Sequence, residues 1–300
     1  MIQLTGLTKV FGRTRAVDDL TCTIEPGVVT GFLGPNGAGK STTMRMIVGL
    51  DRPTAGSATV LGKRYRDLAS PLRSVGALLD ARQVQPNRTA RAHLQWLAAA
   101  NKLPRGRVEE VLGLVGLTDA AGKPAGSFSL GMAQRLGIAG ALLGDPEVLL
   151  FDEPVNGLDP EGIRWIRTLM RDLATQGRTV LVSSHLLAEM ANTADRLVVI
   201  GRGRLIASTT MAEFLDGAGV GTVRVRSPQR DLLREVLTTQ EVSVRDEGDA
   251  LAVTGCSTEQ IGELAAAHGI TLHELSSRQV SLEEAYLQLT DGAVDYRAAS

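Results

Sequence analysis

The 300-residue sequence has few cysteines, no long hydrophobic run and no strong excess of charge of one sign. Its two cysteines, Cys22 and Cys256, are far apart and lack metal-ligand spacing, which excludes a disulfide framework and a structural zinc site and favours reduced cytosolic thiols. No run of about 18 apolar residues occurs, so no transmembrane helix is predicted. The N-terminus also lacks the basic segment and apolar run of a secretory signal. We therefore expect a soluble chain that works at a membrane only through partners.

The formal net charge is −1, so the chain as a whole lacks the basic excess that is typical of nucleic-acid-binding proteins. The charge is unevenly distributed. Residues 1–215 hold 25 Lys and Arg against 19 Asp and Glu, whereas residues 216–300 hold 7 against 14. This asymmetry indicates two units with different surfaces, although two differently solvated surfaces without a functional role would explain it equally well.

Residues 1–215 show strands that alternate with helices. Short apolar, β-branched runs at residues 28–33, 148–151 and 179–183 are typical of buried parallel strands, and a turn precedes the first of them. Apolar residues at three- and four-residue spacing predict helices within residues 89–144 and over residues 161–174. The order predicts an α/β fold with a mixed or parallel sheet and a helical subdomain at about residues 82–144.

Residues 216–300 follow a different pattern. The expected order is strand, helix, strand, strand, helix, strand, which is the ferredoxin-like α+β motif. These elements are predicted at residues 222–226, 231–237, 241–245, 251–254, 258–267 and 270–275. A linker is expected at residues 216–219 and a last helix at residues 281–289, so the predicted domains are residues 1–215 and 216–300.

A glycine-rich segment follows the strand predicted at residues 28–33 and matches GxxxxGK[ST] at every fixed position. Its glycines allow the backbone to wrap around phosphate oxygens, with N–H groups that point inward at a helix N-terminus. Lys40 supplies charge to the β- and γ-phosphates, and the Ser41 hydroxyl is placed to bind Mg²⁺. The residues of this predicted nucleotide site are Gly34, Pro35, Asn36, Gly37, Ala38, Gly39, Lys40 and Ser41.

Two carboxylates follow the buried strand predicted at residues 148–151. Asp152 lies at the end of the run, where its carboxylate would emerge at the edge of the sheet that faces the phosphates and hold the metal. Glu153 follows directly and could polarise the attacking water as a general base. Taken alone, the pair could equally be an acidic turn; together with the glycine-rich loop it indicates a nucleoside triphosphatase.

These motifs resemble those of the ATP-binding subunits of ATP-binding-cassette (ABC) transporters, over residues 1–215 and in the family's order. The most distinctive segment, residues 128–132, reads Phe-Ser-Leu-Gly-Met and is followed by Ala-Gln-Arg. It is similar to the family signature LSGGQ: Ser129 and Gly131 match, and the other three residues depart from it. The resemblance implies that this segment contacts the γ-phosphate bound to the other protomer of a dimer.

The resemblance extends to further residues. Asp159, in Asn-Gly-Leu-Asp, corresponds to the family's D-loop, and His185 is similar to the switch histidine that bonds the γ-phosphate. Phe11 stands where the family carries an aromatic residue that stacks on adenine. Thr42, next to Ser41, is included in the implied nucleotide site. By themselves, His185 and Phe11 would more often be structural residues.

One position departs from the family pattern. Asp80 stands where the family carries the Q-loop glutamine, which touches the metal–water shell and relays nucleotide state to the membrane subunit. An aspartate is shorter and charged, so Asp80 is either a substitute metal contact or a solvated loop acid. The acidic Q-loop residue, the segment at 128–132 and the C-terminal run at residues 281–286 resemble the bacterial drug- and antibiotic-export branch.

The resemblance implies the following function. The chain would bind ATP and Mg²⁺ and hydrolyse ATP, with Lys40, Glu153 and His185 as catalytic residues. A second ATP-binding subunit, most simply another copy, would complete each site. Separate integral-membrane permease subunits would dock on residues 80–140 and carry the cargo, and the resemblance to the export branch implies export of a drug, antibiotic or lipid-like compound. The chain would then lie in the cytoplasm, peripheral to the inner face of the cell membrane. No nucleic-acid partner is expected.

Two alternatives remain open at this stage. A soluble ABC-type ATPase that acts on nucleic acid or ribosomes would need a basic groove, a coiled-coil insertion or a second cassette, and none is visible. A GTPase or small-molecule kinase would not need the segment at residues 128–132. The nearest match to a guanine-reading NKxD, at residues 101–104, lacks the aspartate.

Overall fold

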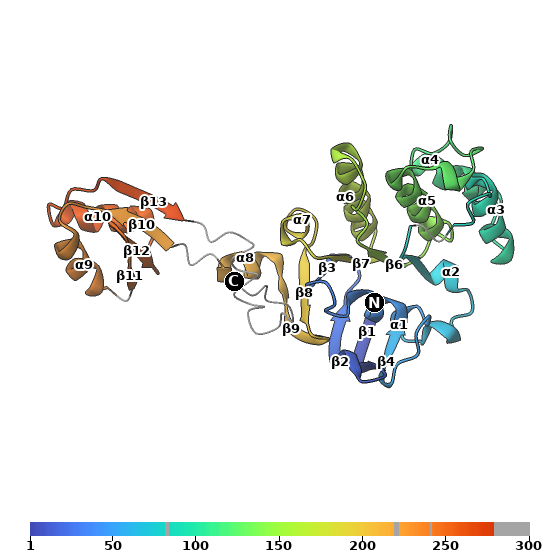
Figure 1. Cartoon of the computed structure of the whole chain (residues 1–300), viewed down its shortest axis with the longest axis horizontal. Helices are drawn as coiled ribbons and strands as arrows, with labels where there is room; N and C mark the ends of the chain where they lie inside the picture. Colours follow the sequence, from blue (N-terminus) through green and yellow to red (C-terminus); the bar gives the residue numbers. More distant parts are fainter. Residues whose placement is uncertain (82–83, 219–221, 241, 279–300) are drawn as a thin grey trace. The chain divides into compact units, whose positions relative to one another are not determined.

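The computed structural model describes residues 1–81, 84–218, 222–240 and 242–278 (Figure 1). These residues divide into two compact units, of which the first ends at Met211 and the second begins at Ala212. That division lies four residues before the boundary that we predict from the sequence. In the described part of the chain, no helix is long and apolar enough to cross a bilayer.

The first unit is built around a six-stranded sheet. Its strands, in order across the sheet, are β5 (Val75–Leu78), β6 (Val148–Asp152), β7 (Thr179–Ser184), β3 (Val29–Leu33), β8 (Arg196–Gly201) and β9 (Arg204–Thr210). The first five run parallel, and β9 is antiparallel to β8. This arrangement confirms the predicted α/β class with a mixed sheet, and the continuous apolar runs predicted as strands are the buried central strands β3, β6 and β7.

Helices cover this sheet on both sides, and a second sheet packs below it. The helices are α1 (Lys40–Ile47), α6 (Pro160–Thr175) and α7 (Leu187–Ala191), and the antiparallel sheet has the order β2 (Thr14–Ile24), β1 (Ile2–Phe11), β4 (Ala55–Val60). Figure 1 shows α6 and α7 on one side of the six-stranded sheet and α1 with the antiparallel sheet on the other. Helix α1 contacts β2, β4 and β6, so its buried Met44 and Ile47 join both sheets in one core with Phe32 and Leu150. Each such buried side chain contributes about 1.5–3 kcal/mol.

The predicted helical subdomain contains three main helices. They are α3 (Ala90–Ala100), α4 (Gly106–Leu114) and α5 (Leu130–Leu142), which contact one another, and α5 also packs on β5. Their fully buried residues Leu94, Leu112 and Leu136 form the contact surface. Short segments η1 (Tyr65–Asp67) and α2 (Pro71–Ser74) precede β5, and η2 (Ala125–Ser127) precedes α5.

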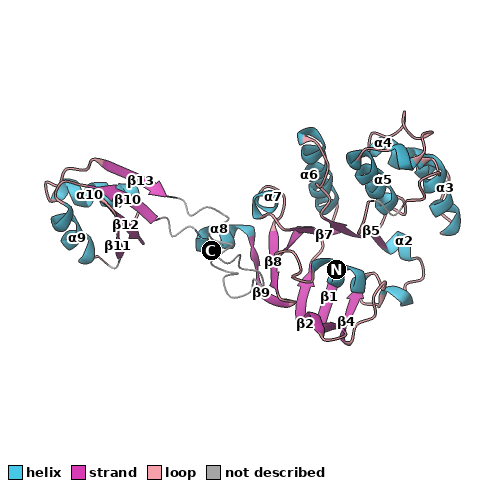
Figure 2. Ribbon diagram, in the orientation of Figure 1, coloured by secondary structure: helices cyan, strands magenta, loops and turns pink. Residues whose placement is uncertain are grey.

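The second unit has the ferredoxin-like order that the sequence predicts (Figure 2). It consists of β10 (Thr222–Arg226), α9 (Arg230–Thr238), β11 (Ser243–Glu247), β12 (Ala250–Thr254), α10 (Thr258–Ala267) and β13 (Glu274–Arg278). The strand order is β11-β12-β10-β13, with every neighbouring pair antiparallel. The helices and one sheet face enclose a separate core that includes Val225, Leu233, Val253 and Ile261.

Two sequence predictions for the second half of the chain need correction. The last strand begins at Glu274 rather than at residue 270, because Ile270 instead closes the end of α10: its N–H bonds Ala265 O at 2.8 Å, after Gly269 at φ +65°. The expected linker is mostly helical, because α8 (Met211–Ala218) continues through Gly217. A single glycine costs a helix only about 1 kcal/mol. The helix expected at residues 281–289 lies outside the described residues.

Candidate functional site

The glycine-rich segment forms a tight loop between β3 and α1. A Cβ on Gly34 would lie 2.6 Å from the backbone oxygen of Ile200. Gly39 has φ +102°, and a Cβ there would lie 2.4 Å from the backbone oxygen of Ala16. Both positions therefore accept only glycine, and the loop is fixed against β8 and β2 before any ligand binds.

Lys40, the first residue of α1, is buried at the centre of this loop, with 7% of its surface exposed. Its Nζ donates hydrogen bonds to Gly34 O at 2.6 Å and to Pro35 O at 3.3 Å, and lies 3.9 Å from Glu153 Oε1. Burial lowers the pKa of this ammonium group, while the charges of Glu153 and Asp152 oppose the shift. The loop thus holds a cation whose partners are carbonyl oxygens that phosphate oxygens can replace.

Asp152 and Glu153 follow each other at the end of β6. Asp152 pairs in register with Ser183 of β7, and the Ser183 hydroxyl donates to Asp152 Oδ1. The same hydroxyl accepts a hydrogen bond from the Glu153 N–H at 3.0 Å. Glu153 has φ +49°, a left-handed conformation that non-glycine residues rarely adopt. Strain of this kind persists where surrounding contacts hold it, and it concentrates at functional sites.

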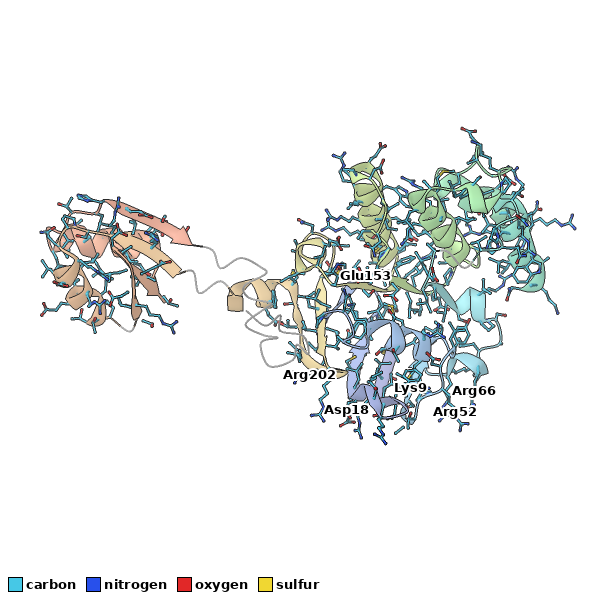
Figure 3. The ribbon with its side chains drawn as sticks, viewed as in Figure 1. Lys9, Asp18, Arg52, Arg66, Glu153 and Arg202 are labelled. Atoms are coloured by element: carbon cyan, nitrogen blue, oxygen red, sulfur yellow. The ribbon has the colours of Figure 1, made fainter. Side chains whose placement is uncertain are left out.

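Three elements converge on Glu153: α1 through Lys40, α5, and the segment that follows β7. Both of its carboxylate oxygens lie 3.0 Å from His185 Nδ1, which follows β7. Gln134 of α5, 4% exposed, donates from Nε2 to the Glu153 backbone oxygen at 3.1 Å. Figure 3 labels Glu153 in the middle of the first unit. The structure therefore brings together the predicted residues Lys40, Asp152, Glu153 and His185.

Gln134 is a residue of this cluster to which the sequence pattern assigns no role. The only available signal is its place in the Gln-Arg pair that follows the segment at residues 128–132. Its contact with Glu153 joins the helical subdomain to the end of β6.

The signature and D-loop residues lie against each other. Ser129 is the N-cap of α5, and its Oγ accepts from Met132 N at 3.2 Å. A Cβ on Gly131 would lie 2.8 Å from Gly157 O, so the two segments are in close contact. Asp159 is the N-cap of α6 and accepts from Gly162 N at 2.8 Å. The hydrogen bonds of Ser129 and Asp159 therefore go to their own helices, and not to the phosphate loop.

The remaining predicted residues are exposed or half-buried. Ser41 and Thr42 lie in the first turn of α1. Phe11, at the end of β1, is 49% exposed, and Lys9 Nζ lies 4.8 Å from the centre of its ring.

Asp80 is exposed and lines a groove of about 410 Å³ between the core and the helical subdomain. Among the described residues, no three His, Cys, Asp or Glu side chains cluster as a metal site, so a bound metal would need oxygens from a ligand or water.

Comparison with known proteins assigns the chain to a family. Residues 17–156 match the family described as ABC transporter, and residues 221–283 match a domain family of unknown function. The uncharacterized ABC transporter ATP-binding protein YhcH of Bacillus subtilis is 36% identical over 97% of this chain and 96% of its own length. The daunorubicin/doxorubicin resistance ATP-binding protein DrrA of Streptomyces peucetius is 34% identical over 99% of this chain and 94% of its own.

Solved structures agree with this assignment. A dimeric post-hydrolysis state of an ATP-binding cassette, bound to ADP and Pi, superposes with a TM-score of 0.64 at 25% identity and covers 70% of this chain and 99% of its own. The shared portion is the size of the first unit. With two relatives above 30% identity along nearly its full length, this chain belongs to the ABC transporter family as an ATP-binding subunit with the family's ATPase domain.

Proposed function

We propose that this chain binds MgATP on the loop around Lys40, hydrolyses it between two copies of the chain, and thereby powers export through separate membrane subunits. The observation that carries the proposal is the convergence on Glu153. Its carboxylate is within 3.0 Å of His185 and 3.9 Å of Lys40, at the end of the strand that also carries Asp152. A base, a cation and a metal-binding carboxylate in one place are what phosphoryl transfer to water requires.

The chemistry of the chain suits magnesium. Mg²⁺ prefers oxygen ligands and is usually held by one or two protein groups together with phosphates and waters. Asp152 Oδ1 is oriented by the Ser183 hydroxyl, and Ser41 offers a second oxygen at the start of α1. We assign these two residues as the metal ligands, with Asp80 as a further contact through water. When bound, the ion would neutralise charge that develops on the phosphates.

In the proposed reaction, Glu153 accepts a proton from the attacking water. In the present arrangement its carboxylate is shared between Lys40 and His185. A nucleotide whose phosphates engage Lys40 and His185 would leave the carboxylate available to accept a proton from a water molecule. The Gln134 contact and the Ser183 contact hold the Glu153 backbone in place during this exchange.

The second copy supplies the other half of each site. Ser129 and Gly131 lie at the N-terminus of α5, where backbone N–H groups and the helix dipole favour a phosphate. Neither residue bonds to the phosphate loop of its own chain in the structure. We assign them, with Asp159, to the nucleotide on the loop of the opposite protomer. The dimeric cassette bound to ADP and Pi supports this arrangement by its likeness.

A groove on the first unit is the proposed docking site for a membrane permease subunit. It is lined by apolar side chains of the core and of the helical subdomain, including Val48, Leu50, Leu72, Trp96, Leu97 and Leu136. Leu50 and Trp96 are 59% and 54% exposed. An amphipathic helix of the membrane subunit is the expected occupant. Asp80, at the Q-loop position, lines the same groove and would therefore lie next to the docked membrane subunit.

Docking of this kind places the chain in the cytoplasm, peripheral to the inner face of the cell membrane. The name of the relative DrrA, a daunorubicin/doxorubicin resistance protein, supports a drug as cargo and export as the direction. We assign residues 1–215 to the ATP-binding domain. We assign residues 216–300 to an accessory domain, and the separate family match over residues 221–283 supports this assignment.

The central test replaces Glu153 by Gln. Loss of the proton acceptor should reduce ATP turnover about 1,000-fold, while the amide still accepts and donates hydrogen bonds and ATP remains bound. Turnover is measured as phosphate release, and bound ATP and dimer formation by gel filtration with labelled nucleotide. Glu161→Gln, an exposed residue in the first turn of α6, is the control with the same charge change. Equal turnover in the two variants would refute the role of Glu153.

The docking proposal has its own test. Trp96→Glu puts a charge into the groove and should reduce co-purification with the membrane subunit at least about tenfold. Leu114→Glu is the control, since Leu114 is 51% exposed but lies on α4 outside the groove. Retention of the membrane subunit by Trp96→Glu would place the docking surface elsewhere.

A further inference from the structure

A second pocket lies at the opposite end of α1 from the phosphate loop. It has a volume of about 380 Å³ and lies between the end of α1, strand β4 and η1. Helix α1 has eight residues and is therefore about 12 Å long, so the pocket is separate from the loop around Lys40. Its floor contains the buried Met46 and Ala58, and the half-buried ring of Tyr65 packs against Gly49.

Three arginines line this pocket: Arg52, Arg64 and Arg66. Figure 3 labels Arg52 and Arg66 next to each other at the outer edge of the first unit. The one acidic residue of the lining, Asp51, is already bound to Arg45, with Nε to Oδ2 at 2.7 Å. The lining therefore has a positive charge that its own aspartate does not neutralise.

The arginines themselves have few acidic partners. In the part of the chain that the structure describes, no ion pair is formed by Arg52 or Arg64. Arg66 has a neighbour, Asp67, at 3.7 Å, but both side chains are more than half exposed, and such pairs contribute little. All three guanidinium groups can therefore turn to an anion.

Other groups of the pocket are compatible with an anion. The carbonyls at the end of α1 would repel one, but they are bonded by following amides: Val48 N to Met44 O at 3.2 Å, and Leu50 N to Arg45 O at 2.9 Å. The phenol of Tyr65, another lining residue, carries no negative charge at neutral pH, and burial raises its pKa further. Residues 55–58 of β4 are Ala, Gly, Ser and Ala, whose small side chains leave the space open.

We propose that this pocket binds a phosphate group, carried by a soluble phosphomonoester or by a lipid headgroup, through Arg52, Arg64 and Arg66. Guanidinium groups bind phosphate through paired, charge-assisted hydrogen bonds, and three of them match its three free oxygens. The volume accommodates one phosphorylated small molecule or headgroup. The apolar floor at Met46 and Ala58 would contact the organic part of the ligand.

The test uses the full chain with its phosphate loop saturated with MgADP, so that only other sites respond. Glycerol 3-phosphate, titrated by calorimetry, probes the soluble source. Co-sedimentation with phosphatidylcholine vesicles, with and without phosphatidic acid, probes the lipid source. The pocket variant carries Arg52→Ser, Arg64→Ser and Arg66→Ser. The control variant carries Arg105→Ser, Lys123→Ser and Arg164→Ser, three exposed cations outside the pocket with the same total charge change.

The pocket variant should bind at least about tenfold more weakly than the wild type in one of the two assays, while the control variant stays within about twofold. A loss in calorimetry identifies the soluble phosphomonoester as the ligand, and a loss in sedimentation identifies the headgroup. Thermal melting establishes that both variants are folded. The proposal is overturned if the wild type binds neither probe, or if the pocket and control variants bind equally, which would indicate unspecific attraction to surface charge.

Discussion

The phosphate-loop side and the signature side of the first unit differ in how far their contacts extend. On the loop side, Lys40 and His185 come from elements that are distant in sequence, and both contact Glu153. On the signature side, Ser129 and Asp159 bond to amides in the first turns of their own helices. One side is assembled within the chain, whereas the other presents two capped helix ends.

Under the proposed function, this difference would explain why a single chain carries both sides and still works with a second copy. A preformed loop can hold a polyphosphate without help, because its donors and its cation are fixed by packing against β8 and β2. The N-terminus of α5 lies against Gly157, and the Ser129 hydroxyl bonds within its own helix and not to the phosphate loop of the same chain. In the proposed symmetric dimer, the signature of each copy would lie on the loop of the other.

Among the variants that compare the two sides, the largest effect is expected from two that each damage one side. Lys40→Ala should weaken ATP binding about 100-fold by removing the cation of the loop. Gly131→Val should bind ATP normally but reduce turnover about 100-fold, because its Cβ would lie 2.8 Å from Gly157 O. An equal mixture should regain about a quarter of wild-type turnover, because half of the dimers then pair unlike copies and contain one intact site.

The mixture is measured by phosphate release against each variant alone at the same total concentration. Mixing Lys40→Ala with a Lys40→Ala chain that carries a different tag is the control, since no intact site can form. If the loop and the signature of the same chain acted together, the two different variants would stay inactive when mixed. That result would refute the assignment of each signature to the loop of the other copy.

A smaller effect is expected at the adenine end of the loop side. Phe11→Ala should weaken ATP binding about 2- to 10-fold, because a ring stack contributes about 0.5–1.5 kcal/mol. Phe11→Tyr should bind like the wild type, since it keeps the ring. Both are measured by fluorescence titration with a labelled ATP analogue. Equal affinity of Phe11→Ala and wild type would assign the exposed ring to its contact with Lys9 alone.

The sequence predicts the residues of the loop side better than the residues that support them, because the loop-side residues lie in short continuous motifs. Gly34 to Ser41 form one motif, and Asp152 ends a run that reads as a buried strand. The support of these residues is tertiary and was not predictable: Ser183 lies 31 positions after Asp152, and Gln134 reaches Glu153 from another helix. Spacing along the chain does not reveal such contacts.

Short or weakly apolar elements are the second part of the fold that the sequence pattern does not reveal. Strand β5 has only four residues, and β4 is built of small residues whose pattern does not indicate a strand. The three arginines of the second pocket all lie within residues 52–66, one before β4 and two after it, but their positions in the sequence do not show that they line one pocket. The expected linker at residues 216–219 was assigned from its glycines, but the helix-forming residues before it extend α8 through Ala218.

On the signature side, Ser129 can be tested as a cap and as a phosphate contact separately. Ser129→Ala should lower the free energy of unfolding by about 1 kcal/mol, because it loses the cap bond to Met132 N. Ser129→Asp should keep most of the stability, since aspartate is an equally good N-cap, but its charge would repel a phosphate. Urea unfolding and phosphate release distinguish the two roles. Full turnover in Ser129→Asp would leave Ser129 as a cap alone.

The smallest effect concerns the acid stability of the loop side. Asp18, 7% exposed, bonds Arg15 at 2.5 Å and Arg204 at 2.6 Å, and both arginines lower its pKa from the ordinary 3.8. Because its folded pKa lies below the unfolded value, its contribution to stability is complete above about pH 4 and is lost as the pH falls through the folded pKa.

Asp18 also supports the phosphate loop through the backbone. Its N–H bonds Gly203 O at 2.8 Å, and the Gly203 N–H bonds Ala38 O at 3.0 Å. Thermal melting between about pH 7 and about pH 2 should therefore show a steeper acid loss for the wild type than for Asp18→Asn. Asp119→Asn, an exposed aspartate of the helical subdomain, should keep the wild-type slope. Parallel curves for wild type and Asp18→Asn would show that the loop is held without this carboxylate.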